Sequence, residues 1–179
     1  MVASNIEEVL GKLAPFLGHL EQGMLEHGLS LRLGPMDHIC YRAATTQEYL
    51  ELRARLMMFG EVLVEGMIGQ RPIITYRLHH AIPSAFGPIR CLELAAPKAG
   101  KRHLAGLEHG EIVVLSLEQL LLDYPWVPFN CSALHSSHPE LTLSLAPYQI
   151  KFHCQSLADT IAIEIALQQV VPVPTDYFA

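Results

Sequence analysis

The 179-residue chain has few basic residues: 12 lysines and arginines against 18 aspartates and glutamates, a formal net charge of −6. Proteins that bind nucleic acid neutralise phosphates with a basic patch or stripe, and this sequence contains no such run. We therefore expect no nucleic-acid partner.

Cysteine is also scarce, and the four residues present are far apart with no Cys-x-x-Cys pair: Cys40, Cys91, Cys131 and Cys154. This spacing argues against both a zinc knuckle and a disulfide scaffold. We expect reduced thiols in the core.

Long apolar runs are missing as well. No stretch of 18 or more consecutive apolar residues occurs, and Glu7 and Glu8 stand where a signal peptide would carry Lys or Arg. These absences predict a cytoplasmic protein without a membrane partner. Half of the residues are hydrophobic, and the length is close to the roughly 150 residues usual for one domain. We therefore expect a single domain over 1–179 with a sizeable core.

Two strand-like runs each open on an acidic residue followed by histidine. Asp37-His38 begins the run that ends at Arg42, and Glu108-His109 begins the run that ends at Leu115. Because side chains of a strand alternate between its faces, His38 shares a face with Arg42, and His109 shares one with Glu111. The repetition indicates an internal duplication with a site at its pseudo-symmetric centre.

Helical signals flank these runs. Capping boxes start at Ser4, Thr45 and Ser156, and Pro15 fits the first turn of a helix that ends at Gly28. We expect a helical cover at 1–28 and a closing helix at 155–171. Both are predicted on the convex face of a sheet, with four apolar residues buried: Leu10, Leu17, Ile161 and Ile165.

Between these helices, the order strand, helix and three strands occurs twice, at 29–96 and at 107–154, with a polar linker at 97–106. In the second copy we place the helix at 116–123 and the next strand near Cys131. Each unit alone leaves an apolar face and an open edge, so two units pair and curl. The predicted fold class is α+β: paired βαβββ modules that form a cup-shaped half-barrel sheet with flanking N- and C-terminal helices.

An ordered set of motifs resembles the YecM family within the vicinal-oxygen-chelate superfamily, the glyoxalase, bleomycin resistance and dihydroxybiphenyl dioxygenase-like proteins. The motifs extend from about Leu29 to Glu164, and only their ordered set is specific. They are Asp37-His38-Ile39 with Arg42, Gly60-Glu61-Val62-Leu63, Gly69-Gln70-Arg71-Pro72-Ile73, Glu93-Leu94, Glu108-His109-Gly110-Glu111-Ile112-Val113 and Ile150-Lys151-Phe152-His153.

The resemblance implies a divalent metal held by residues of the first, fourth, fifth and eighth strands. The matching positions are His38, Glu93 and His109. The eighth-strand ligand of the superfamily is usually a glutamate, whereas this chain has Ile150-Lys151-Phe152-His153, so the fourth ligand stays unassigned. Two imidazoles and one carboxylate suit Fe, Zn, Mn or Ni with open positions for an oxygenated ligand.

Other polar residues are candidates for contact with a substrate. Glu111 is the candidate catalytic residue, either orienting a ligand or acting as a general base if burial raises its pKa. Arg42 is a candidate for binding a substrate carboxylate, Arg71 for ligand capture, and Lys151 and His153 for completing the wall of the site.

Each candidate also has a structural interpretation. Glu93 can form a buried ion pair with Arg42 or Arg77. Glu111, Lys151 and His153 can form a polar network that satisfies itself, and Arg71 can serve the turn before Pro72.

Three functions remain open at this point. One is a metal-dependent isomerase, lyase or dioxygenase acting on a small oxygenated metabolite. Another is a non-catalytic small-molecule or metal-binding module with the same cup, and the third is an interaction protein with a vestigial cup. We expect a small-molecule ligand and either a monomer or a homodimer.

Overall fold

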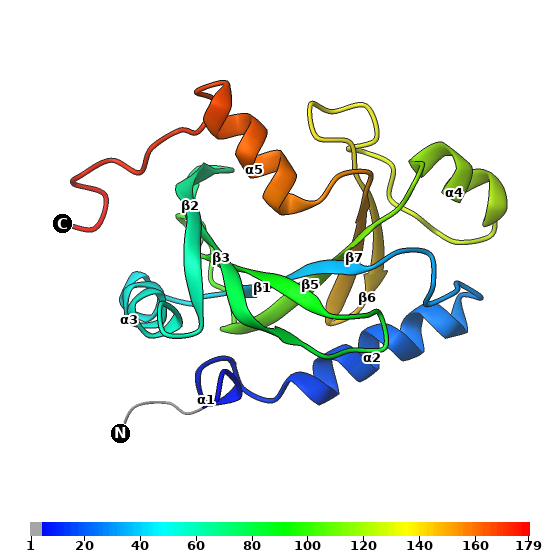
Figure 1. Ribbon diagram of the computed structural model, residues 1–179, viewed down its shortest axis with the longest axis horizontal. Helices are drawn as coiled ribbons and strands as arrows, with labels where there is room; N and C mark the ends of the chain where they lie inside the picture. The colour runs from blue at the N-terminus through cyan, green and yellow to red at the C-terminus, as the bar shows by residue number, and fades with distance from the viewer. Residues whose placement is uncertain (1–4) are drawn as a thin grey trace.

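The computed structural model describes residues 5–179, which form a mixed α+β fold built on one curved seven-stranded sheet (Figure 1). The strands are β1 Met36–Arg42, β2 Gly60–Ile68, β3 Arg71–Ile82, β4 Ile89–Ala95, β5 Gly106–Val113, β6 Leu141–Leu145 and β7 Tyr148–His153. Their order across the sheet is β2-β3-β4-β1-β5-β7-β6. The predicted fold class, a cup-shaped sheet with flanking helices, is confirmed.

The helices are α1 Glu7–Leu10, α2 Leu13–Glu26, α3 Thr46–Leu56, α4 Leu117–Asp123 and α5 Leu157–Ala166. The predicted caps of α3 and α5 are present: the Thr45 hydroxyl accepts from the Glu48 amide, and the Ser156 hydroxyl accepts from the Asp159 amide, each at 3.1 Å. The predicted cap at Ser4 lies outside the described residues.

At the centre of the sheet, β1 and β5 pair antiparallel, and each pairs parallel with a strand of its own half, β4 for β1 and β7 for β5. The pairing of β1 with β5 contains two irregularities. Asp37 is the extra residue where Met36 faces Ile112 and His38 faces Glu111. Glu108 is the extra residue of the second bulge. Both bulges therefore fall on the acidic residue that precedes a histidine.

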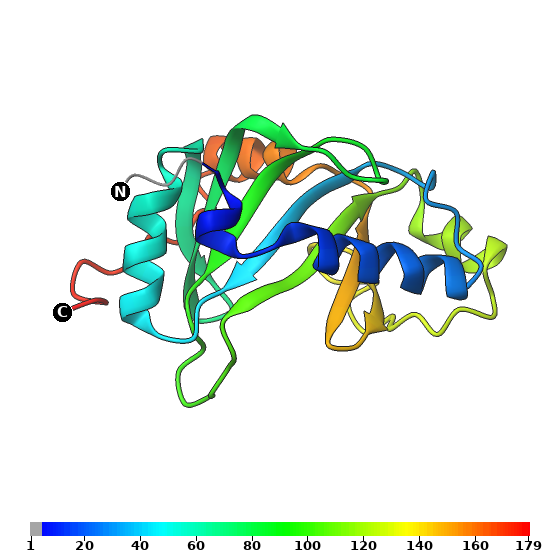
Figure 2. The same ribbon diagram turned by 90° about the horizontal axis from the view of Figure 1, so that it is seen from below.

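Two helices cover the convex face of the sheet. Figures 1 and 2 show α2 crossing the face opposite to α5, and Phe16, Leu20 and Met24 of α2 are at most 1% exposed. Tyr49, Leu52 and Leu56 of α3 join the same apolar cluster. Burial of this continuous apolar face is the main stabilising contribution to the fold.

The predicted place of the closing helix is wrong: α5 lies over the concave face, across the mouth of the cup (Figure 1). Leu10 and Ile161 are buried as expected, but Leu17 is half-buried and Ile165 is 51% exposed. Because α2 and α3 already occupy the convex face, the apolar surface left for α5 is on the concave face. One row of α5 side chains contacts it.

The strand predicted near Cys131 does not form. Asn130 makes only an isolated bridge with Thr142, so β6 stays at the edge of the sheet. The segment after Asn130 is polar and serine-rich and offers no apolar face to bury. Cys131 and Cys154 are exposed free thiols, contrary to the expectation of core cysteines, whereas Cys40 and Cys91 are buried. Within residues 5–179, no helix has the length and apolar character needed to cross a membrane.

Candidate metal centre

A cavity of about 600 Å³ lies between the concave face of the sheet and α5. Its floor carries His38 and Cys40 of β1, Glu93 of β4, and His109 and Glu111 of β5. A second cavity of about 530 Å³, beside α1 and α2 on the opposite side, contains none of these residues. The helix over the mouth therefore encloses the candidate site and does not fill it.

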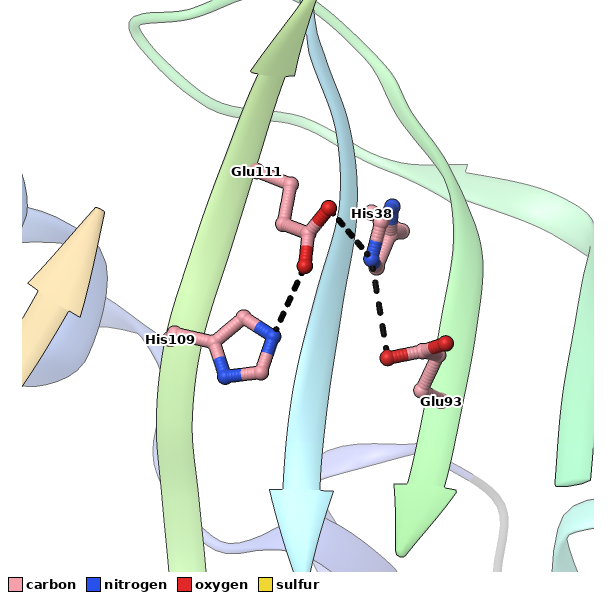
Figure 3. Close-up of side chains that lie close together, drawn as sticks. All are labelled: His38, Glu93, His109 and Glu111. Atoms are coloured by element: carbon pink, nitrogen blue, oxygen red, sulfur yellow. Dashed lines mark hydrogen bonds and ion pairs between the residues drawn. The ribbon is translucent and has the colours of Figure 1, made fainter. Parts of the chain in front are cut away.

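Four side chains converge on the floor of the cavity (Figure 3). His38 Nε2 lies 3.6 Å from Glu93 Oε2 and 3.4 Å from Glu111 Oε2, and His109 Nε2 lies 3.1 Å from Glu111 Oε1. One ligand atom from each of the four residues lies within 4.8 Å of the others. The two imidazoles come from the paired central strands, and their ring centroids are 6.4 Å apart.

The bulges give each histidine a carboxylate neighbour on its outer nitrogen. Asp37 Oδ2 lies 3.0 Å from His38 Nδ1, and it also accepts from the Leu157 amide at the start of α5, at 2.9 Å. Glu108 Oε1 lies 3.8 Å from His109 Nδ1. A carboxylate at Nδ1 favours the tautomer that leaves the Nε2 lone pair free, the usual support of a metal-binding histidine. Asp37 therefore orients His38, whereas Glu108 pairs with Arg42 and His109 Nδ1 has no hydrogen-bond partner.

Glu111 is the most connected group of the site. Burial alone would raise its pKa, but the charge of His38 and hydrogen bonds from His109 and His153 outweigh burial, so the pKa lies well below its usual value. The pKa of Glu111 is thus lowered and not raised in this cluster, and its role as a general base stays a prediction. Its carboxylate stays ionised because the neighbouring imidazoles and Lys151 stabilise the charge.

The pKa of His38 is raised well above its usual value. Burial lowers it, but the charge of Glu111 and the hydrogen bond to Asp37 outweigh that effect. Even so, His38 Nε2 is buried with no hydrogen-bond partner of acceptable geometry. A buried polar atom in this state is costly, and a cation that replaces the Nε2 proton at the centre of the four residues would satisfy it.

Lys151 and His153 belong to a polar network at the edge of the centre. His153 Nε2 lies 2.7 Å from Glu111 Oε2, and Lys151 Nζ lies 3.1 Å from Glu140 Oε2. Sequence reasoning missed Glu140, which no strand pattern marks. Its position beside Lys151 follows from the pairing of β6 with β7, where Thr142 faces Lys151.

The three arginines named from the sequence are placed differently from one another. Arg42 pairs with Glu108 and contacts His103, so its charge is already balanced. Arg77 lies 3.9 Å from Glu61. Among residues 5–179 no arginine lies within 4.0 Å of Glu93, so the alternative of a buried ion pair for Glu93 is not formed. Arg71 is 8% exposed and lines the cavity.

The donor set fits a divalent cation. Two imidazole nitrogens and two carboxylates, held by three adjacent strands and backed by Asp37, match the preferences of Fe, Mn, Zn and Ni. Glu111 of β5 lies among the other three residues of this group, which contains no residue of β7. The register of the central strands brings Glu111 next to His38.

Comparisons with known proteins agree with the fold. Protein YecM of Escherichia coli (strain K12) is 27% identical over 182 residues, covering 89% of this chain and 94% of that protein. A solved structure titled "Structural Genomics, Protein EC4020" aligns with a TM-score of 0.75 and 25% identity, over 92% of this chain and 98% of its own. Hypothetical protein BH1468 from Bacillus halodurans C-125 aligns at a TM-score of 0.47 with 12% identity, over 66% of this chain and 91% of its own, too distant to bear on function. The family model described as YecM protein matches residues 5–126, and the chain therefore belongs to the YecM family.

Proposed function

We propose that this protein holds one divalent metal ion between His38, Glu93, His109 and Glu111. The observation that carries the proposal is the convergence of their four ligand atoms within 4.8 Å on the floor of a cavity large enough for a small molecule. The metal identity stays open among Fe, Zn, Mn and Ni, since each accepts imidazole and carboxylate ligands.

In this proposal the protein acts on a small oxygenated metabolite in the manner of a vicinal-oxygen-chelate isomerase, lyase or dioxygenase. When bound, the metal would polarise a carbonyl or enolate oxygen. The chain supports the site in two ways. Asp37 orients His38, and α5 limits the access of water from above.

A non-catalytic binding module with the same cup is the second candidate. One observation favours it: four basic side chains, those of His38, His109, Lys151 and His153, lie within 4.0 Å of the Glu111 carboxylate and occupy both of its oxygens. Under this alternative, Lys151 and His153 serve only to hold Glu111 in place, and the protein binds its ligand without turnover.

Metal analysis of untagged protein purified without chelator tests the proposal. We expect about one metal ion per chain in the parent, and much less in Glu111→Gln and His109→Gln. His79→Gln is the control, because His79 is exposed and does not line the cavity. Metal content that is low in the parent, or equal in all four proteins, would refute the site.

Turnover is tested separately on the metal-loaded parent. Oxygen uptake and NMR of a panel of catechols, vicinal diols and 2-oxo acids would reveal a dioxygenase, lyase or isomerase. Saturable binding without any product would favour the non-catalytic module.

A further inference from the structure

The cavity contains a second polar feature at the turn between β2 and β3, where Arg71 begins β3. Its guanidinium donates one hydrogen bond, from Nη1 to the Ala96 carbonyl oxygen at 3.2 Å, and its Nε is buried without a partner. No carboxylate of residues 5–179 forms an ion pair with it, although Arg71 is only 8% exposed. An enclosed cation without a counter-ion is costly for the fold, so its retention calls for a functional reason.

A second cation lies on the same wall. Lys98 lines the cavity next to Arg71, whose positive charge is the main reason that the pKa of Lys98 is lowered. The charge of the nearby Arg42 is not available to a ligand, because Arg42 pairs with Glu108. Arg71 and Lys98 therefore form a positive end of the cavity, and the carboxylates that attract Arg71, those of Glu108 and Glu93, form no ion pair with it.

The free part of the Arg71 guanidinium has a defined shape. The bond from Nη1 to Ala96 anchors one end of the group, and Nε is buried without a hydrogen-bond partner. Two parallel N–H groups along one edge match the two oxygens of a carboxylate. The ammonium group of Lys98 acts as a point charge, so it attracts a carboxylate from any direction.

The positive end and the metal centre belong to the same cavity. Arg71, Ile73 and Thr75 all line it from β3, and Thr75 pairs directly with Glu93 of β4. Arg71 and Thr75 are four residue steps apart on β3. At ~3.3 Å per residue, their Cα atoms are ~13 Å apart. A ligand that reaches both ends is therefore a small chain molecule and not a polymer.

We propose that Arg71 and Lys98 form a carboxylate-binding subsite, so that the ligand of this cavity carries a carboxylate at one end and metal-chelating oxygens at the other. The chelating end rests on the function proposed above. The carboxylate end rests on the contacts of Arg71 alone, which allows the two to fail separately.

The test is a calorimetric titration of metal-loaded protein, at constant ionic strength, with linear dicarboxylates from malonate to adipate and with hexane-1,6-diol. We expect the parent to bind at least one dicarboxylate and not the diol. Arg71→Gln should weaken the affinity at least about tenfold, the scale of charge-assisted hydrogen bonds, and Lys98→Gln less. Arg90→Gln, which removes a charge from an exposed position outside the cavity, should bind like the parent.

Repeating the titration after chelation separates the two proposals. If Arg71→Gln also weakens dicarboxylate binding to the metal-free protein, the carboxylate subsite is supported even if the metal site fails. Equal affinities of the parent and Arg71→Gln, or binding of dicarboxylates no tighter than of chloride, would overturn the subsite.

Folding is monitored in the same variants. Arg71→Gln removes a buried cation without a counter-ion, so the melting temperature of the ligand-free protein should hold or rise. A lower melting temperature with unchanged affinity would show that Arg71 serves only the turn before Pro72. If Arg71→Gln folds poorly, Arg71→Lys keeps the charge but lacks the two-donor edge, and parent-like affinity in that variant overturns the proposal.

Discussion

Replacing Glu93 by glutamine should affect metal binding strongly and the stability of the metal-free protein only slightly. Glu93 has no arginine within 4.0 Å among residues 5–179, and its nearest charged partner is His38, at 3.6 Å. A carboxylate oxygen of Glu111 lies within 4.8 Å of the candidate ligand oxygen of Glu93. The substitution therefore also relieves a repulsion between two negative charges. We therefore expect Glu93→Gln to change the stability of the metal-free protein by less than about 1 kcal/mol. For a chain of this length that is at most about 4 °C in melting temperature.

The metal-loaded protein should behave differently. At a free metal concentration about 100 times the Kd, binding stabilises the parent by about 2.7 kcal/mol, or ~5–11 °C. Changes to groups behind a ligand weaken metal binding by about 10- to 100-fold, so loss of a direct ligand should cost at least the upper value. At the same metal concentration the variant would gain only ~0.4 kcal/mol, less than about 2 °C.

The assay is differential scanning fluorimetry of chelated and metal-loaded protein, with metal content measured in parallel. Glu61→Gln is the matched control, because Glu61 is exposed on β2 and its contact with Arg77, at 3.9 Å, is a surface pair. It should respond to metal like the parent. A loss of about 3–5 kcal/mol in metal-free Glu93→Gln, ~6–20 °C, would show that Glu93 is half of a buried ion pair and would remove it from the site.

Three further predictions concern other parts of the molecule. Asp37→Asn should weaken metal binding about 10- to 100-fold in a competition titration, because it removes the charge that orients His38. Burial and the hydrogen bond to Glu48 raise the pKa of Tyr41 to about 12, which favours the neutral phenol in the folded state. Denaturant titrations should therefore show stability lost as the pH rises from about 10 to 12, and Tyr41→Phe should remove about 2–3 kcal/mol of that loss, because burial also raises the pKa of Tyr49 and Tyr76. Gly34→Ala should cost more than about 3 kcal/mol in the same titrations, because a Cβ at this position collides with the backbone oxygen of Val113.

Each of these predictions has a result that contradicts it. Metal affinity of Asp37→Asn equal to that of the parent would show that His38 needs no orienting carboxylate. An alkaline stability loss as large in Tyr41→Phe as in the parent would show that Tyr41 does not contribute to it. Parent-like stability of Gly34→Ala would mean that the β5 backbone can move away from Gly34.

Much of the architecture could be predicted from local pattern. The strands containing His38 and His109 follow from period-two alternation, and the caps of α3 and α5 follow from the short-range chemistry of Thr45 and Ser156. The boundaries of the two modules remain a prediction. The strand near Cys131 failed because a polar segment that buries nothing has no reason to extend the sheet.

The sequence by itself determined the two acid-histidine pairs and the strands that carry them, because alternation and capping act within a few residues of the chain. The tertiary structure alone decided that Glu93 and Glu111, both candidates from the sequence, meet the two histidines at one centre. Glu111 joins His38 and Glu93 through the register of strands about 70 residues apart, and Asp37 and Glu108 turn toward the histidines through bulges that exist only in the paired sheet. The face chosen by α5 depends on which surface the other helices leave uncovered, and no local pattern encodes that choice.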